Sequence, residues 1–284
     1  MLTYIDSFFS DPVGMLVIFL LAFPGRILAL SAHEFAHAWV ADRCGDPTAR
    51  MMGRLTLNPL KHLDPLGTIL MLVVGFGWAR PVPVNPRNYR NYRRDDLKVS
   101  LAGVTMNLIL FVASMLIMIA LVAAALGRVP VGLLSQTGGA VSRGSYAGQE
   151  CLFFMEGTSS YYLPLRTLLN MLPYAGDYLI KPVFGEIAGR LYQMLGYFAM
   201  TNLVLCLFNL IPIPPLDGYH VLNDLVLKRS LFANPNVSRY ASAALFLLVM
   251  SGAVGRVLGF VDGAVLSGAG ALAEAILRAL GLMG

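Results

Sequence analysis

An apolar, helix-compatible run near the start of the chain carries two histidines and a glutamate: ILALSAHEFAHAWVA, residues Ile27–Ala41. Histidines four residues apart share one face of a helix, so such a pair can bring two imidazole nitrogens to one tetrahedral Zn²⁺. Glu34 directly follows the first histidine, where it can take a proton from an attacking water. His33 and His37 are therefore candidate metal ligands, and Glu34 is the candidate general acid/base.

The composition around this run is that of a membrane protein. Of the 284 residues, 57% are hydrophobic and 13% are charged, whereas a soluble domain carries about 25% charged residues. This balance argues against a soluble enzyme, a disordered chain and a coiled coil, and continuous runs such as Leu108–Leu126 argue against a transmembrane β-barrel. Ionisable groups inside a membrane are costly and usually functional. We therefore favour a metal site over two interior histidines that happen to pair with polar groups.

Apolar segments predict an all-α polytopic membrane protein with about five to six transmembrane helices. The segments are Pro12–Val40, Leu66–Trp78, Val99–Leu126, Leu191–Leu210, Ala241–Phe260 and Ala264–Leu282. The first is longer than a hydrocarbon core and is interrupted at Pro24, so it is either one kinked span or two. The second is short for a full span, and the last is a weak span or an interfacial helix. The alternating prolines of Pro81–Val84 predict a small membrane-associated β segment after the histidine-bearing helix.

Basic residues predict the topology. Ten basic and four acidic residues lie between Arg43 and Lys98, against five basic and four acidic residues in 127–190. Loops rich in Lys and Arg stay cytoplasmic, so we expect residues 127–190 to form an extracytoplasmic insert and the histidines to face the cytoplasmic side of the cell (inner) membrane. The first eleven residues lack Lys and Arg, which predicts no cleavable signal peptide. No pattern favours nucleic acid as a partner, and nothing predicts an oligomeric state.

A third metal ligand is needed, because a catalytic zinc usually has three protein ligands and one open position. The best candidate is Asp217, which lies in the sequence NLIPIPPLDG, Asn209–Gly218. Its three prolines must break the preceding helix, and broken backbone at membrane depth needs cover from protein or a water-filled cavity. The alternative is an aspartate that caps the next helix. Because the two motifs are expected at the same depth in the membrane, we favour Asp217 as a metal ligand.

The two motifs together resemble those of the site-2 protease family of intramembrane zinc metalloproteases. Further stretches resemble its compact prokaryotic-type branch, which has no PDZ or CBS domain: Gly45–Arg50, Gly53–Pro59, His62–Thr68 and Pro81–Pro86. Residues Ala102–Asn107 resemble the G-P-x-x-N element of the family, except that Val104 stands where the family usually has proline.

The resemblance implies a single membrane-embedded protease domain over residues 1–284 that holds one Zn²⁺ through His33, His37 and Asp217. Glu34 would be the general acid/base, and Asn107 would donate to the developing oxyanion. The alternative for Asn107 is an interhelical hydrogen bond. The implied substrates are transmembrane proteins in the lipid bilayer, cleaved in regulated intramembrane proteolysis.

Several other polar residues are expected to be structural. Asn209 would support the proline-rich turn, His62 would lie in a loop at the membrane surface, and His220 would at most assist a ligand. Three cysteines without CxxC spacing exclude a disulfide framework and a cysteine zinc site; they are Cys44, Cys151 and Cys206.

Two other classes of function remain open from the sequence. A metal-binding membrane transporter or chaperone could use the same His/His/Asp trio, although a transporter usually spreads ionisable residues over several spans. A catalytically dead scaffold would be expected to have lost Glu34 or Asp217, and both are present.

Overall fold

The computed structural model describes residues 10–74, 77–131, 141–147, 149–156, 159–227 and 235–283. The first nine residues, where most of the expectation about a signal peptide falls, lie outside this part of the chain. The chain divides into two compact units, residues 1–111 with 201–260 and residues 112–200 with 261–284. All five expected site residues lie in the first unit.

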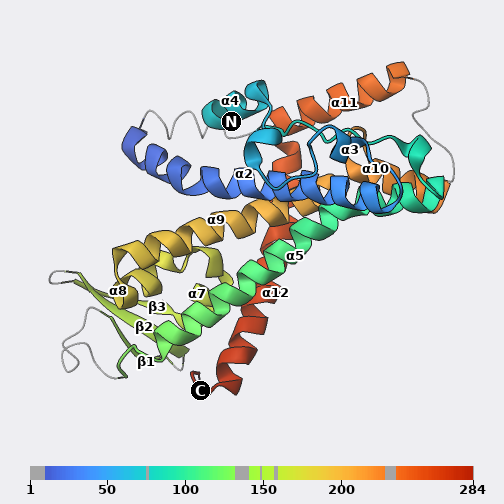
Figure 1. Cartoon of the computed structure of the whole chain (residues 1–284). Coiled ribbons are helices and arrows are strands. Elements are labelled where there is room, and N and C mark those ends of the chain that lie inside the picture. Colours follow the sequence, from blue (N-terminus) through green and yellow to red (C-terminus); the bar gives the residue numbers. More distant parts are fainter. Residues whose placement is uncertain are drawn as a thin grey trace. The chain divides into compact units, whose positions relative to one another are not determined.

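Four of the described helices are long and apolar enough to cross a membrane (Figure 1): α2 (Pro12–Arg43), α5 (Tyr92–Leu126), α9 (Glu186–Asn209) and α12 (Ala253–Ala279). At about 1.5 Å per residue, each is longer than a hydrocarbon core of ~30 Å. Shorter helices accompany them: α4 (Pro65–Val74) and α11 (Pro235–Met250). These helices confirm a mostly α, polytopic membrane protein.

The first apolar segment forms one continuous helix, although Pro24 lies inside it. Its N-terminus is capped by Asp11, whose side chain accepts a hydrogen bond from the Gly14 N–H at 2.9 Å. Many of its buried residues are small, which allows neighbouring segments to approach the helix closely; they are Ala22, Gly25, Ala29, Ser31, Ala36, Ala38 and Ala41. The alternative of two separate spans is therefore wrong.

The boundary expected for the fifth span is also wrong. Ala241–Phe260 is divided between α11 and α12, because Gly252 adopts a positive φ of 75° and ends the continuous helical path. A left-handed glycine is a common way to terminate a helix. The segment Ala264–Leu282 is not a separate element, since most of it belongs to the 27-residue helix α12.

The sheet lies elsewhere than expected. Three antiparallel strands in the order β1-β2-β3 form within residues 127–190: β1 (Val141–Tyr146), β2 (Gln149–Glu156) and β3 (Ser159–Pro164). Between α2 and α5, the described residues show only an isolated bridge, which joins Leu63 and Ala79. Pro81 and Pro83 lack the N–H that a strand ladder needs, so that stretch is extended without being part of a sheet.

Short helices complete the two units. The sheet is followed by α7 (Leu165–Asn170), η3 (Leu172–Tyr174), η4 (Gly176–Ile180) and α8 (Lys181–Phe184). The proline-rich break after α9 is followed by α10 (Asp217–Leu222) and η5 (Asn223–Leu227). The connection between α2 and α5 contains, besides α4, the short elements α3 (Thr48–Met51), η1 (Pro59–Lys61) and η2 (Pro86–Asn88).

A fully buried carboxylate, Asp46, joins the beginning and the end of this connection. It accepts hydrogen bonds from the Asn85 N–H at 2.6 Å, the Asn88 amide at 2.8 Å and the Thr48 N–H at 3.1 Å, and also from the Thr48 hydroxyl. Burial alone would raise the pKa of Asp46, but these hydrogen bonds outweigh it and hold the pKa below its usual range.

Replacement of Asp46 by alanine is expected to destabilise the protein by about 3 kcal/mol at neutral pH, because Thr48, Asn85 and Asn88 all lose the buried carboxylate that accepts their hydrogen bonds. Since the folded pKa lies below the unfolded value, the stabilisation is complete above the unfolded pKa of about 3.9 and is lost as the pH falls through the folded pKa. Thermal unfolding of wild type and Asp46→Ala in detergent, between pH 7 and pH 3, measures how the stability difference depends on pH. A stability gap that stays constant over that range would contradict the assignment.

Candidate metal centre

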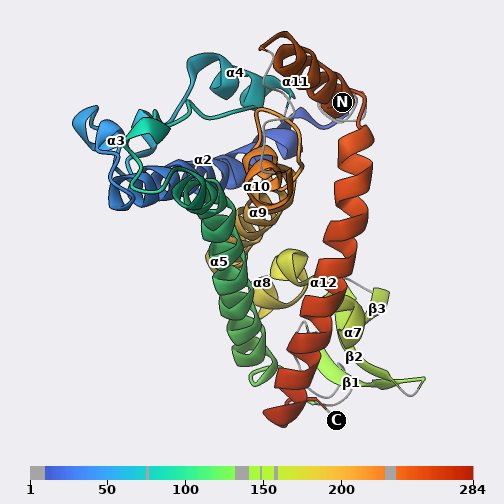
Figure 2. The same ribbon diagram turned by 90° about the vertical axis from the view of Figure 1, so that its right-hand side faces the viewer.

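Three potential ligands from two distant parts of the chain converge in the first unit. His33 and His37 lie on α2, and Asp217 is the first residue of α10, which lies beside α2 and the first part of α5 (Figures 1 and 2). The two Nε2 atoms are 3.0 Å apart, and Asp217 Oδ2 lies 3.4 Å from Nε2 of His33 and 3.3 Å from Nε2 of His37. Ligand atoms of all three residues lie within 4.8 Å of one another.

The hydrogen bonds of the two imidazoles leave the lone pairs of their Nε2 atoms free to face the place where the three residues converge. His37 Nδ1 lies 2.7 Å from the carbonyl oxygen of Val99, and His33 Nδ1 lies 3.1 Å from Oδ1 of Asn107. Both partners are acceptors, so each Nδ1 carries the proton and each Nε2 offers a lone pair. Asp217 Oδ2 is buried and has no hydrogen-bond partner within the described residues. Three potential electron-pair donors thus face one another, which suits a bound cation.

A glycine on α5 makes this approach of helices possible. A Cβ atom placed on Gly103 would lie 2.4 Å from Cε1 of His33 and 2.5 Å from Nε2 of His37. Any larger residue would therefore push the imidazoles out of position. The close approach also brings Asn107, one helical turn further along α5, against His33.

The proline-rich break places Asp217. Helix α9 ends at Asn209, and α10 begins at Asp217 after a short irregular stretch. Leu216 occupies the N-cap position, so the capping role considered for Asp217 is not observed. A Cβ on Gly218 would lie 2.3 Å from the carbonyl oxygen of Leu210, so this tight return requires glycine.

The catalytic candidate Glu34 points toward the extended segment that precedes η2. Its Oε2 accepts a hydrogen bond from the Val82 N–H at 2.8 Å. Val82 was not predicted from the sequence, because almost any residue type supplies a backbone N–H. The alternating prolines on either side of Val82 are the only local signal.

The sequence of the chain matches an established family. The model of peptidase family M50 matches residues 19–252. The chain belongs to this family. It is 36% identical over 221 residues to the "Putative zinc metalloprotease YwhC" of Bacillus subtilis, covering 78% of the chain and 74% of the relative. It is 34% identical over 106 residues to the "Putative zinc metalloprotease Rip2" of Mycolicibacterium smegmatis, covering 36% of the chain and 40% of that relative. No solved structure matches the chain.

Membership of family M50 makes the chain a zinc metalloendopeptidase of the site-2 protease type. The cofactor is Zn²⁺, for which the His/His/Asp cluster supplies suitable ligands. The individual roles of the five site residues remain predictions. The structure shows for Asn107 the interhelical hydrogen bond that was its alternative, and its role toward an oxyanion stays untested.

The remaining polar candidates of this M50 peptidase have hydrogen-bond partners outside the His/His/Asp cluster. His62 is 1% exposed rather than at a surface, and its Nε2 lies 2.7 Å from the carbonyl oxygen of Thr56. His220 Nδ1 lies 3.3 Å from Asp96. Asn209 donates to the Leu205 carbonyl of its own helix at 3.0 Å. The three cysteines are free and buried, as packing residues would be.

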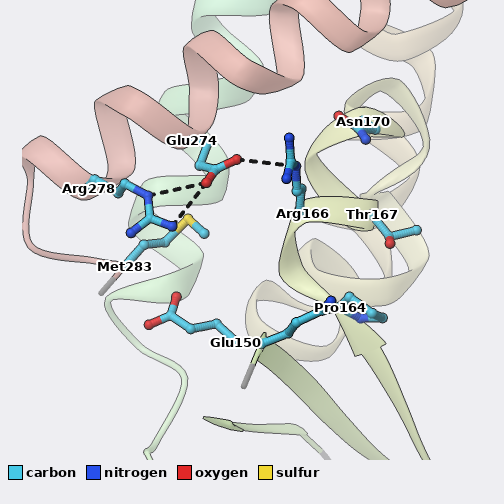
Figure 3. A pocket seen from close by; sticks show the side chains of 9 residues that line it. Glu150, Pro164, Arg166, Thr167, Asn170, Glu274, Arg278 and Met283 are labelled. Carbon is cyan, nitrogen blue, oxygen red and sulfur yellow. Dashed lines mark hydrogen bonds and ion pairs between the residues drawn. The ribbon is translucent and has the colours of Figure 1, made fainter. Parts of the chain in front are cut away.

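The second unit contains a polar cavity of about 420 Å³ that is unrelated to the metal ligands. Figure 3 shows the carboxylate of Glu274 between the side chains of Arg166 and Arg278 at its wall, at 3.7 and 3.0 Å. Glu150 also lines this cavity, so two arginines and two glutamates balance one another in charge. Within the described residues, the cluster on α2 and α10 is the group with metal-ligand geometry.

Proposed function

We propose that this M50 peptidase hydrolyses peptide bonds in or near the transmembrane segments of membrane-protein substrates, as in regulated intramembrane proteolysis. The observation that carries the proposal is the position of His33, Glu34 and His37 on α2, a helix long and apolar enough to span a membrane. A protease whose catalytic residues lie on a membrane span meets substrates that share the bilayer.

The chain contributes binding, orientation and proton transfer. Bound zinc supplies a Lewis acid that polarises the scissile carbonyl and makes water more acidic. Glu34 accepts the proton of the attacking water and passes it to the leaving amine. The hydrogen bonds of His33 to Asn107 and of His37 to Val99 orient both imidazoles and raise their basicity as ligands.

The proposed location is the cell (inner, cytoplasmic) membrane, with the site toward the cytoplasm and residues 127–190 outside. The excess of basic residues between Arg43 and Lys98 supports this orientation. Two segments of this basic stretch contact residues of the site, since Val82 contacts Glu34 and Val99 contacts His37.

The test is cleavage by the purified protein in vesicles, with single-span membrane proteins tagged at both ends as substrates. We expect one bound zinc per chain and release of fragments whose cut lies within or beside the apolar segment. Chelation with 1,10-phenanthroline should stop cleavage, and added zinc should restore it. Zinc flux across the vesicles without any cleavage would contradict the proposal and favour the metal transporter.

A further inference from the structure

The extended segment Arg80-Pro81-Val82-Pro83 has few backbone N–H donors. Proline has no N–H, so Val82 is the sole donor between positions 80 and 84. That single donor is bonded to Oε2 of Glu34 at 2.8 Å. A residue before proline is also restricted to extended conformations, which fixes the direction of the Val82 N–H.

A buried arginine also binds this segment. Arg54 is 7% exposed, and its Nη2 donates to the carbonyl oxygens of Arg80 at 2.7 Å and Pro81 at 3.3 Å. The Arg80 N–H in turn donates to the His62 carbonyl at 2.8 Å. Burying a guanidinium is costly unless it is hydrogen-bonded. Both hydrogen bonds of this buried charge go to the two peptide groups that precede Val82.

Packing completes the contact with α2. The Val82 side chain is 8% exposed and packs with Ala38 and Ala49. Ala38 lies four residues after Glu34, on the same face of α2. Val82 therefore meets this face twice, through its N–H at Glu34 and through its side chain at Ala38.

We infer that Arg54 and Val82 are positioning residues for Glu34: the arginine fixes the segment, and the Val82 N–H fixes the carboxylate. This inference rests on the proposed function. A glutamate has three rotatable side-chain bonds, and holding Oε2 leaves Oε1 in a defined place to receive a proton. Misplacement of a reacting group by about 1 Å can cost ~100-fold in rate.

The decisive comparison uses two proline substitutions. Val82→Pro removes the N–H that reaches Glu34, whereas Val84→Pro removes an N–H with no partner among the described residues. We expect Val82→Pro to lower kcat about 10- to 100-fold, with KM and zinc content unchanged. Val84→Pro, which keeps the Val82 N–H, should stay within about threefold of wild type. Equal kcat values for the two proline variants would overturn the inference.

Infrared spectroscopy makes the same comparison without requiring catalysis. In zinc-free protein, the infrared carboxylate bands of Glu34 are assigned by their loss in Glu34→Gln. We expect these bands to shift in Val82→Pro and to stay in place in Val84→Pro. Unchanged bands in both variants would also overturn the inference.

The arginine offers a second route if Val82→Pro loses zinc or does not fold. Arg54→Met should lower kcat without changing KM or zinc content, and Arg54→Lys, which can still donate to a carbonyl, should restore part of the loss. Equal kcat for both variants and wild type would contradict the role of Arg54. Absence of cleavage by wild type itself would instead overturn the proposed function, so the two failures are distinguishable.

Discussion

Glu34→Gln is expected to reduce peptide hydrolysis at least 1,000-fold while leaving zinc binding intact. General acid–base catalysis contributes typically about 10² to 10⁴-fold, and glutamine cannot accept the proton. The amide oxygen of glutamine can still accept the hydrogen bond that the Val82 N–H now donates to Oε2. The substitution thus removes the chemistry and keeps the local structure.

The measurement combines cleavage of a membrane substrate with the zinc content of the purified protein. Uncleaved substrate should accumulate in membranes that contain Glu34→Gln and not in membranes that contain wild type. The matched control is Glu186→Gln, at the exposed start of α9, which should cleave normally. Equal cleavage by Glu34→Gln and wild type would exclude Glu34 as the general base.

The metal cluster was predictable because most of its geometry is local. Helical periodicity alone places His33 and His37 on one face of α2, so the sequence spacing fixes two ligands. Asp217 is 180 residues away from His37, and its assignment needed a second argument, the helix break at membrane depth. The structure brings all three together, with distances of 3.0 to 3.4 Å between their ligand atoms.

The parts that escaped prediction depend on backbone groups and on close packing. The Val82 N–H and the Val99 carbonyl would be present with almost any side chain, so residue type gives no sign of their role. Gly103 matters because two helices approach there, and a single glycine in an apolar helix is common. Periodicity reports which face is apolar, but it does not report how near the next helix lies.

The predicted boundaries of the last spans were wrong for a related reason. Hydropathy over Ala241–Phe260 is continuous, yet the positive φ of Gly252 separates α11 from α12. The glycine- and alanine-rich end of the chain looked like a weak span because these residues add little hydropathy. In the structure it is part of the 27-residue helix α12, which is long enough to cross the membrane.

Asp217→Ala should lower zinc affinity more than 100-fold. Loss of groups that merely orient zinc ligands already costs about 10- to 100-fold, and here a ligand itself would be lost. The two histidines would remain, held by their Nδ1 hydrogen bonds to Asn107 and Val99. Two neutral nitrogens without the carboxylate would leave the charge of the zinc ion uncompensated in a buried site.

The control for this experiment lies seven residues further along. Asp224 is on η5, outside the cluster, and Asp224→Asn should keep zinc at the wild-type level. Zinc content after dialysis against a buffered series of free zinc concentrations gives both affinities. Retention of wild-type affinity in Asp217→Ala would contradict the assignment and direct attention to His220, three residues beyond it. Zinc loss in Asp217→Ala alone would establish that the aspartate after the proline-rich break completes the metal centre on α2.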